Sequence, residues 1–170
     1  MKTRQLFPLF AGLFLAGLVH SVAAAPAVVP ANVTVIYQDP DNFTDVCEGP
    51  GNFTSPYYLE VLKEYLQQTA SPLLAPGQKL TITISDIDLA GETRFGSPDN
   101  IRIIKDVFIP RVVLKFELVD AAGKVVKEGA RRLTDLNFTY KLHLPGFNEP
   151  LFYDKEMLKD WVVREFRAKA

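Results

Sequence analysis

Strict alternation of apolar and polar residues marks two stretches of the chain as β-strands with one buried face. In "KLTITISDIDL", residues 79–89, apolar side chains occupy the even positions up to Ile84, and threonine and serine occupy the odd ones. "NVTVIY", residues 32–37, alternates in the same way over a shorter length. Because successive side chains of a strand point to opposite faces, each stretch is predicted to cover a core with one face.

A third alternating stretch is predicted to form a β-hairpin. "PRVVLKFELVD", residues 110–120, is followed by "AAGK" and then by "VVKEGARRL". Two strand-like runs are thus separated by a short turn that contains glycine. We expect the hairpin to span Arg111–Leu133, with Gly123 at the position that requires positive φ.

Apolar residues recur at helical spacing in two stretches, Tyr57–Leu74 and Asp154–Phe166. Thr54 or Ser55 is expected to cap the first helix, because Pro56 then falls in its first turn. The second stretch carries acids in its first turn and arginines near its end, which suits the helix dipole. Both stretches are predicted to be amphipathic helices that lie on a core.

The expected order of elements is strand, helix, strand, strand, strand, helix. Alternating strands are typical of antiparallel sheets with one covered face, and two amphipathic helices are available to cover it. We therefore predict an α+β fold with two layers, in which an antiparallel sheet of about four strands carries both helices on one face.

The first 24 residues have the three-part layout of a secretory signal peptide. "MKTRQ" carries two cations and no acid, an apolar run over Leu6–Val19 follows, and small residues lead up to Ala24. The run is interrupted by Pro8 and is shorter than the roughly 20 residues of a spanning helix. We expect cleavage after Ala24, which leaves one globular domain, 25–170. This domain is expected to lie in the periplasm or to be secreted, without stable insertion in a membrane.

Charge, cysteine and histidine content exclude several classes of protein. Removal of residues 1–24 takes away two of the 19 Lys and Arg and leaves 17 against 20 Asp and Glu, a net charge of −3. The cations are scattered except for Arg131 and Arg132, so no nucleic-acid partner is expected. Cys47 is the only cysteine, which excludes an intrachain disulfide. His143 is the only histidine after residue 24, which excludes a zinc site built on two histidines.

Two acids end the clearest strand, in "SDIDLAG", residues 85–91. Asp86 and Asp88 have even numbers, like the apolar residues up to Ile84, so they would lie on the same, buried face of the strand. A β-bulge at Ser85 would instead reset the register and turn both acids to solvent. Without a bulge, the carboxylates would lie about 7 Å apart at the edge of the core, where they could hold a cation or act as an acid and a base. They could also fix the following loop and pair with a cation such as Arg94. We favour this structural role, because ion-pair networks are commoner than catalytic pairs.

A second acid cluster, "DPDNFTD", places Asp39, Asp41 and Asp45 in a loop. A hand-type calcium loop would add a third acid at its fifth position, a central glycine and a closing glutamate, and this segment has none of them. We therefore predict Asx-turns here rather than a metal site.

Several longer segments resemble one family of exported bacterial proteins, described as domain of unknown function 3016. The resemblance rests on "DIDLAGE", "IRIIKD", "IPRVVLKFELVDAAGKVVKEG", "LTDLNF" and the terminal "YDKEMLKDWVVREF". It covers residues 33–166. It implies a Gram-negative envelope setting, hence the periplasm, and it assigns no catalytic residue.

The sequence shows no nucleophile, metal or cofactor signature, so we predict a non-catalytic domain that needs no cofactor. It is expected to bind an envelope protein or a small ligand through the loop 90–106 and one face of the sheet. The alternative is a carboxylate-dependent hydrolase or lyase, or a divalent-metal-binding protein, that uses Asp86 and Asp88. The binding residues predicted are Asp86, Asp88, Arg94, Arg111 and Arg131, with Lys115 and Arg132 on the same sheet face.

Overall fold

The observed helices and strands follow the predicted order. The computed structural model describes residues 30–47, 53–93, 102–142 and 149–167, so the predicted signal peptide lies outside the described residues. Its long elements are β1 (Val33–Tyr37), α1 (Pro56–Ala70), β2 (Lys79–Asp88), β5 (Arg111–Val119), β6 (Val125–Thr134) and α2 (Phe152–Phe166). Its short elements are the strands β3 (Glu92–Thr93) and β4 (Arg102–Ile103) and the 3-10 turns η1 (Pro40–Asn42), η2 (Ser71–Leu73) and η3 (Phe138–Tyr140). The α+β class is confirmed.

The four long strands form one sheet in the order β1-β2-β5-β6, and β3 and β4 form a separate small ladder. β2 pairs antiparallel with β5, and β5 with β6, as predicted. β1 pairs parallel with β2, so the sheet is mixed and differs from the expected antiparallel arrangement in this one pairing. The reason is the connection: α1 carries the chain back along the sheet, so β2 starts at the same end as β1.

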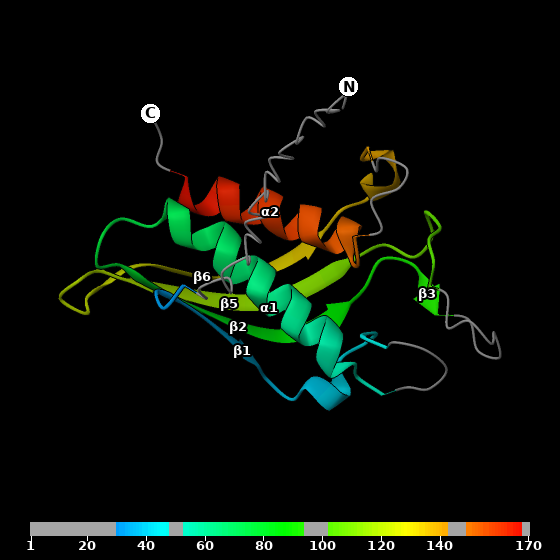
Figure 1. Cartoon of the computed structure of the whole chain (residues 1–170), viewed down its shortest axis with the longest axis horizontal. Helices are drawn as coiled ribbons and strands as arrows, with labels where there is room; N and C mark the ends of the chain where they lie inside the picture. The colour runs from blue at the N-terminus through cyan, green and yellow to red at the C-terminus, as the bar shows by residue number, and fades with distance from the viewer. Residues whose placement is uncertain (1–29, 48–52, 94–101, 143–148, 168–170) are drawn as a thin grey trace, which may run out of the picture.

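Both long helices cover the same face of the sheet and leave the other face open (Figure 1). α1 begins after Ser55, whose hydroxyl accepts a hydrogen bond from the backbone N–H of Tyr58. This confirms the predicted cap and selects Ser55 over Thr54. The apolar positions of both helices are buried against the strands, as their spacing predicts. They are Leu62, Leu66 and Ala70 in α1 and Met157, Leu158, Trp161, Val162 and Phe166 in α2.

A β-bulge in β2 decides which way the two acids of "SDIDLAG" point. The register of β2 against β5 shifts between Ile84 and Asp86. Ile84 is buried before the shift, and Ile87 and Leu89 are buried after it. The bulge alternative is therefore the correct one: both acids lie on the open face of the sheet.

The β5–β6 hairpin forms as predicted. Gly123 in its turn has φ 80°, and its N–H donates to the backbone carbonyl of Asp120. The Asp120 carboxylate accepts hydrogen bonds from the N–H groups of Ala122 and Lys124. The Asp120 carboxylate thus stabilises the turn by hydrogen bonds, and Gly123 allows its positive φ.

No helix in the described part of the chain is both long enough and apolar enough to cross a membrane.

Candidate functional site

One arginine bridges the two acids of the "SDIDLAG" stretch. Arg111 lies directly opposite Asp88 across β2 and β5. Its Nη2 atom lies 3.2 Å from a carboxylate oxygen of Asp86 and 3.2 Å from one of Asp88. Asp86 also accepts hydrogen bonds from the backbone N–H of Thr44 at 2.8 Å and from its hydroxyl at 3.1 Å. The cation is Arg111; Arg94, which was expected here, lies outside the described residues.

The two acids are not equivalent. Burial raises the pKa of Asp88, and the Asp45 and Asp86 carboxylates raise it further against the opposing effect of Arg111. Asp86 receives three donors, two from Thr44 and one from Arg111. Asp86 therefore links the segment before α1 to the end of β2. The charged form of Asp88, in contrast, is destabilised by burial and by the neighbouring carboxylates.

Arg102 in β4 holds the turn that follows the acids. Its guanidinium donates to the backbone carbonyls of Ala90 at 2.7 Å, Leu89 at 3.0 Å and Gly91 at 3.0 Å. It also forms a 2.6 Å ion pair with Asp45, and its side chain is only 11% exposed. Carbonyls of three consecutive residues thus converge on one partly buried cation, which explains the shape of the "DLAG" turn.

Gly91 is required in this turn for two reasons. Its φ is 83°, a conformation that side chains with a Cβ rarely adopt. A Cβ built on it would also lie 2.6 Å from the carbonyl oxygen of Ile103. The small β3–β4 ladder can therefore approach the end of β2 only where residue 91 is glycine.

A buried carboxylate joins the same turn to α2. Asp154, 2% exposed, accepts a hydrogen bond from the backbone N–H of Ala90 at 3.0 Å. Burial raises the pKa of Asp154 to about 6, although the Ala90 N–H and Arg102 act in the opposite direction. The turn is therefore held by two side chains, the Arg102 guanidinium from β4 and the Asp154 carboxylate from α2.

Besides the ion pair of Asp45 with Arg102, two acids of the "DPDNFTD" loop accept hydrogen bonds from nearby residues. Asp39 accepts a hydrogen bond from the side-chain amide of Asn42. Asp45 accepts one from the backbone N–H of Cys47, which is the Asx-turn that the sequence predicts. Among the residues that the structure describes, no three His, Cys, Asp or Glu side chains are grouped so that they could hold a metal ion.

A cavity of about 390 Å³ opens beside Asp88. Asp45, Asp88 and Arg111 in its lining belong to the network already described, and its apolar lining comes from the segment before β5. The lining residues are Asp45, Asp88, Gly91, Glu92, Val107, Phe108, Ile109 and Arg111.

Arg131 does not join the other predicted binding residues, because it lies on the helix side of the sheet. It contacts Glu165 of α2 at 2.9 Å and lies over the ring of Phe116. Lys127 shares Glu165 at 2.8 Å. Burial acts to raise the pKa of Glu165, but these two cations outweigh it and lower the pKa. Arg131 therefore ties β6 to α2.

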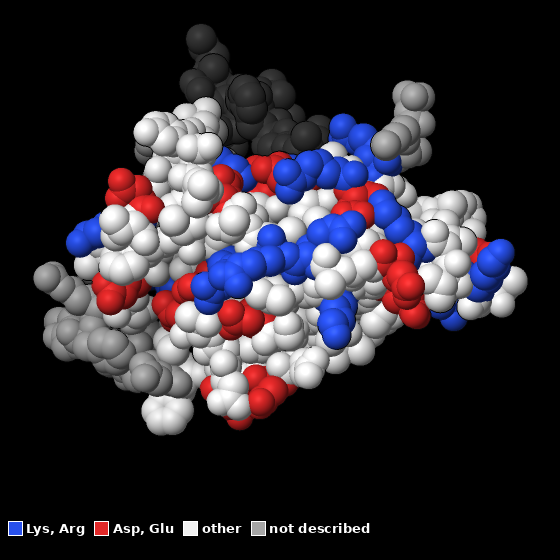
Figure 2. Space-filling view, turned by 180° about the vertical axis from the view of Figure 1, so that it is seen from behind, with Lys and Arg blue, Asp and Glu red and all other residues white. Residues whose placement is uncertain are grey.

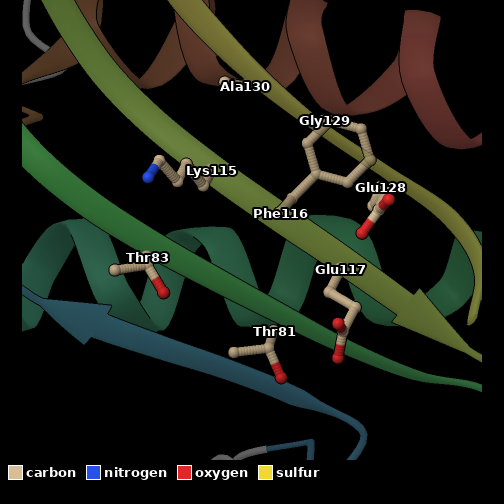
Figure 3. Close-up of a pocket in the computed structure, with 8 residues that line it drawn as sticks. All are labelled: Thr81, Thr83, Lys115, Phe116, Glu117, Glu128, Gly129 and Ala130. Atoms are coloured by element: carbon tan, nitrogen blue, oxygen red, sulfur yellow. The ribbon is translucent and has the colours of Figure 1, made fainter.

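The open face of the sheet contains a hollow of about 630 Å³ over β2, β5 and β6. In Figure 3 the helices lie behind the sheet, and Thr81, Thr83, Lys115 and Glu117 stand on the near side of β2 and β5. In Figure 2, which shows the molecule from the side away from the helices, Lys and Arg side chains cross the middle of the face. The hollow offers hydroxyl groups and charges of both signs to a partner.

Four charged side chains of β5 and β6 on the open face are unpaired within the described residues. The strand register places Glu117 directly opposite Glu128, a pair of like charges that repel each other. Lys115, Glu117, Glu128 and Arg132 form no ion pair or side-chain hydrogen bond with other described residues, and all four are exposed. Their charges are therefore available to a partner.

Comparison with known proteins identifies a family but no activity. Residues 31–164 match the model of the family "Protein of unknown function (DUF3016)". No curated protein sequence matches the chain.

Two solved structures share a weak likeness. A PelC dodecamer from Paraburkholderia phytofirmans is 16% identical, with 86% of this chain and 96% of that chain covered and a TM-score of 0.38. An uncharacterized protein is 12% identical, with 78% and 83% covered and a TM-score of 0.33. At these TM-scores neither likeness carries an argument about fold or function.

Proposed function

The chain belongs to the family "Protein of unknown function (DUF3016)", and from that premise we propose that it is an exported, non-catalytic domain that binds a protein of the cell envelope through the open face of its sheet. The proposal covers the face formed by β2 and β5, with Lys115 and Glu117 as its charged contacts and Thr81 and Thr83 as its hydroxyl contacts.

The observation that carries this proposal is the contrast between two groups of charged side chains. Near the end of β2 and at the start of β5, Asp86 and Arg111 are engaged with other parts of the chain. On the open face, Lys115 and Glu117 are exposed and contact no opposite charge among the described residues. Exposed charges that form no ion pair with the described residues and lie in a hollow suit the recognition of a partner of complementary charge.

The same contrast gives less support to the carboxylate-dependent alternative. An acid and base pair needs one carboxylate that is free to take or give a proton at a substrate. Asp86 already accepts three hydrogen bonds, two from Thr44 and one from Arg111. Asp88 shares the same arginine nitrogen, so the two acids act as one ion-pair unit with Arg111.

Export is part of the proposal and rests on the first residues of the chain. A short cationic start, an apolar run and small residues up to Ala24 form the pattern of a cleaved secretory signal. The family resemblance to exported bacterial proteins points to the periplasm, where an envelope protein would be the partner.

The proposal is tested by site-specific photo-crosslinking in the exporting cell. A photoreactive amino acid replaces Thr83 in the hollow, and the matched control carries it at Glu64, which is exposed on α1 on the opposite side of the sheet. We expect a cross-linked product of one defined mass from position 83 and none from position 64. The charge substitutions Lys115→Glu and Glu117→Lys should each abolish the product, because both lie in the hollow.

Three outcomes would overturn the proposal. The first is no defined product from position 83, and the second is the same product from positions 83 and 64. The third is a product of twice the mass of the chain, which would assign the open face to a second copy rather than to another protein.

A further inference from the structure

No described strand pairs with the outer edge of β6. β6 pairs only with β5 in the described part of the sheet and runs over ten residues, Val125–Thr134, without proline. Its residues are exposed at most positions, and Val125 and Val126 are 42% and 48% exposed. An edge of this length presents a row of unpaired backbone N–H and C=O groups, which is a template for another strand.

Charges on an edge strand usually prevent such pairing, but on β6 they divide into two groups. Lys127 and Arg131 are turned toward α2 and share Glu165. Glu128 and Arg132 point to the open face, where neither finds an opposite charge among the described residues. Across the sheet, Glu128 meets Glu117 and Arg132 meets Val113. The complement for this acid and this base is missing inside the described part of the chain.

The sequence of β6 supplies that complement when the strand is paired with itself. In an antiparallel pair centred on Ala130, residues whose numbers sum to 260 lie opposite each other. Glu128 then faces the Arg132 of a second copy, and Arg132 faces the Glu128 of that copy. Ala130 faces Ala130 between them. The single register thus forms two opposite-charge pairs and no like-charge pair on the open face.

We propose that a second copy of this chain is the partner of the β6 edge, paired antiparallel about a two-fold axis at Ala130. Such an interface uses the same patch on both copies, as closed dimers do, and adds main-chain hydrogen bonds to the charge pairs. The Ala130 carbonyl already accepts a bond from Arg131, and a carbonyl has a second lone pair for the new strand.

The pairing joins the two four-stranded sheets into one sheet of eight strands. The two open faces become continuous across the axis, so each binding hollow lies next to its symmetry mate. The interface itself uses the edge of β6, whereas the binding proposed above uses the face of β2 and β5, so the two proposals stand or fall separately.

The test is the molar mass in solution of the protein expressed from its full-length gene, measured by light scattering after gel filtration between about 1 and about 100 μM. We expect twice the mass of the chain. Glu128→Arg and Arg132→Glu each place like charges opposite each other twice, and each should raise the dimer dissociation constant at least about tenfold. The double variant, Glu128→Arg with Arg132→Glu, should restore the dimer.

The matched control is Glu117→Gln, which removes a charge without placing a cation opposite Glu128. Glu117 lies on the same face and directly beside Glu128, but one strand away from the edge, so the dimer should persist. A monomer of the wild type at every concentration would overturn the proposal, as would a dimer that neither single charge reversal weakens. Loss of the dimer in Glu117→Gln but not in Glu128→Arg would overturn the edge pairing and indicate that copies meet face to face instead.

A second readout does not depend on the charge variants. Ala130→Cys in a Cys47→Ser background places one thiol from each copy at the axis, where two thiols come within reach of a disulfide. Mild oxidation should give a covalent dimer, and Thr83→Cys in the same background should remain monomeric on a denaturing gel. A covalent dimer from position 83 but not from position 130 would contradict the edge pairing.

Discussion

Single residues at the turn after β2 hold three parts of the chain together. Arg102 reaches the carbonyls of residues 89–91 and the carboxylate of Asp45, and Asp154 reaches the N–H of Ala90 from α2. A buried cation that loses its acceptors, or buried acceptors that lose their cation, cost far more than a surface pair. The stability of the fold at this end therefore depends on two side chains.

Arg102→Ala is expected to lower the free energy of unfolding by about 3 kcal/mol, because it leaves three carbonyls and Asp45 without their shared donor. Urea unfolding measures the loss. Lys124→Ala, an exposed cation in the hairpin turn, is the control and should change stability by less than about 0.5 kcal/mol. Equal effects from the two substitutions would show that Arg102 does not fix the turn.

Asp154→Asn is expected to change how stability depends on pH. The pKa of Asp154 is about 6 in the fold, against an ordinary value of 3.8 for an aspartate, so the folded protein binds this proton more tightly than the unfolded chain. Protonation therefore stabilises the fold as pH falls, and the contribution is lost as pH rises through about 6. Asn imitates the protonated acid and does not titrate. The free energy of unfolding of the variant minus that of the wild type should therefore be larger at about pH 7.5 than at about pH 5.

Urea unfolding of both proteins at the two pH values measures that difference, and contributions common to both proteins cancel. If the stability of the variant minus that of the wild type is the same at both pH values, or larger at the lower pH, the result would contradict the raised pKa of Asp154.

The sequence identifies some of these residues and misses others for a physical reason. Asp86 and Asp88 stand out because they interrupt an apolar parity within one strand. Arg102 and Asp154 give no such signal, because their partners lie in other segments: Asp45 is 57 residues from Arg102, and Ala90 is 64 residues from Asp154. The position of Arg102 within "IRII" is the one local hint, since a cation between apolar residues needs an acceptor.

At the scale of elements, periodicity predicts where helices and strands occur but not every pairing between them. The two helices and the β5–β6 hairpin were predicted from spacing alone. The parallel pairing of β1 and β2 could not be, because alternation has the same form in parallel and antiparallel strands. The bulge in β2 was left open because it depends on which residues of β5 lie opposite, and that register is a tertiary property.

Two glycines with the same backbone conformation provide a test of the turn after β2. Gly91 and Gly123 have φ of 83° and 80°, but only at Gly91 would a Cβ meet other atoms, the nearest being the Ile103 carbonyl oxygen. Gly123→Ala should cost about 1 kcal/mol from the backbone alone, and Gly91→Ala clearly more. Thermal unfolding measures both, and a smaller loss at Gly91 than at Gly123 would contradict the close approach of β4.

At the scale of the whole molecule, two helices cover one face of the sheet and the charged, hollow face remains open. The charged side chains fall into two sets. One set, which includes Asp86 and Arg111, joins segments within the chain, and the other, which includes Lys115 and Glu117, is exposed on the open face. Export would place the outward set in the envelope, where a partner can reach it.

The N-terminus of the protein recovered from the exporting cell tests the export proposal. Cleavage after Ala24 predicts a chain that begins at Ala25 and is found in the periplasmic fraction. Mass spectrometry of the intact protein determines the first residue. A chain that still begins at Met1 in the cytoplasmic fraction would refute both cleavage and export.

The division of charges between folding and binding is the central claim, and the free energy of urea unfolding tests it most directly in Asp86→Asn and Glu117→Gln. Asp86→Asn should lose about 1 to 3 kcal/mol, because its carboxylate accepts from Thr44 and Arg111. Glu117→Gln should leave stability unchanged or raise it slightly, because it removes a like charge opposite Glu128. An unchanged Asp86→Asn together with a destabilised Glu117→Gln would reverse the assignment and contradict the account.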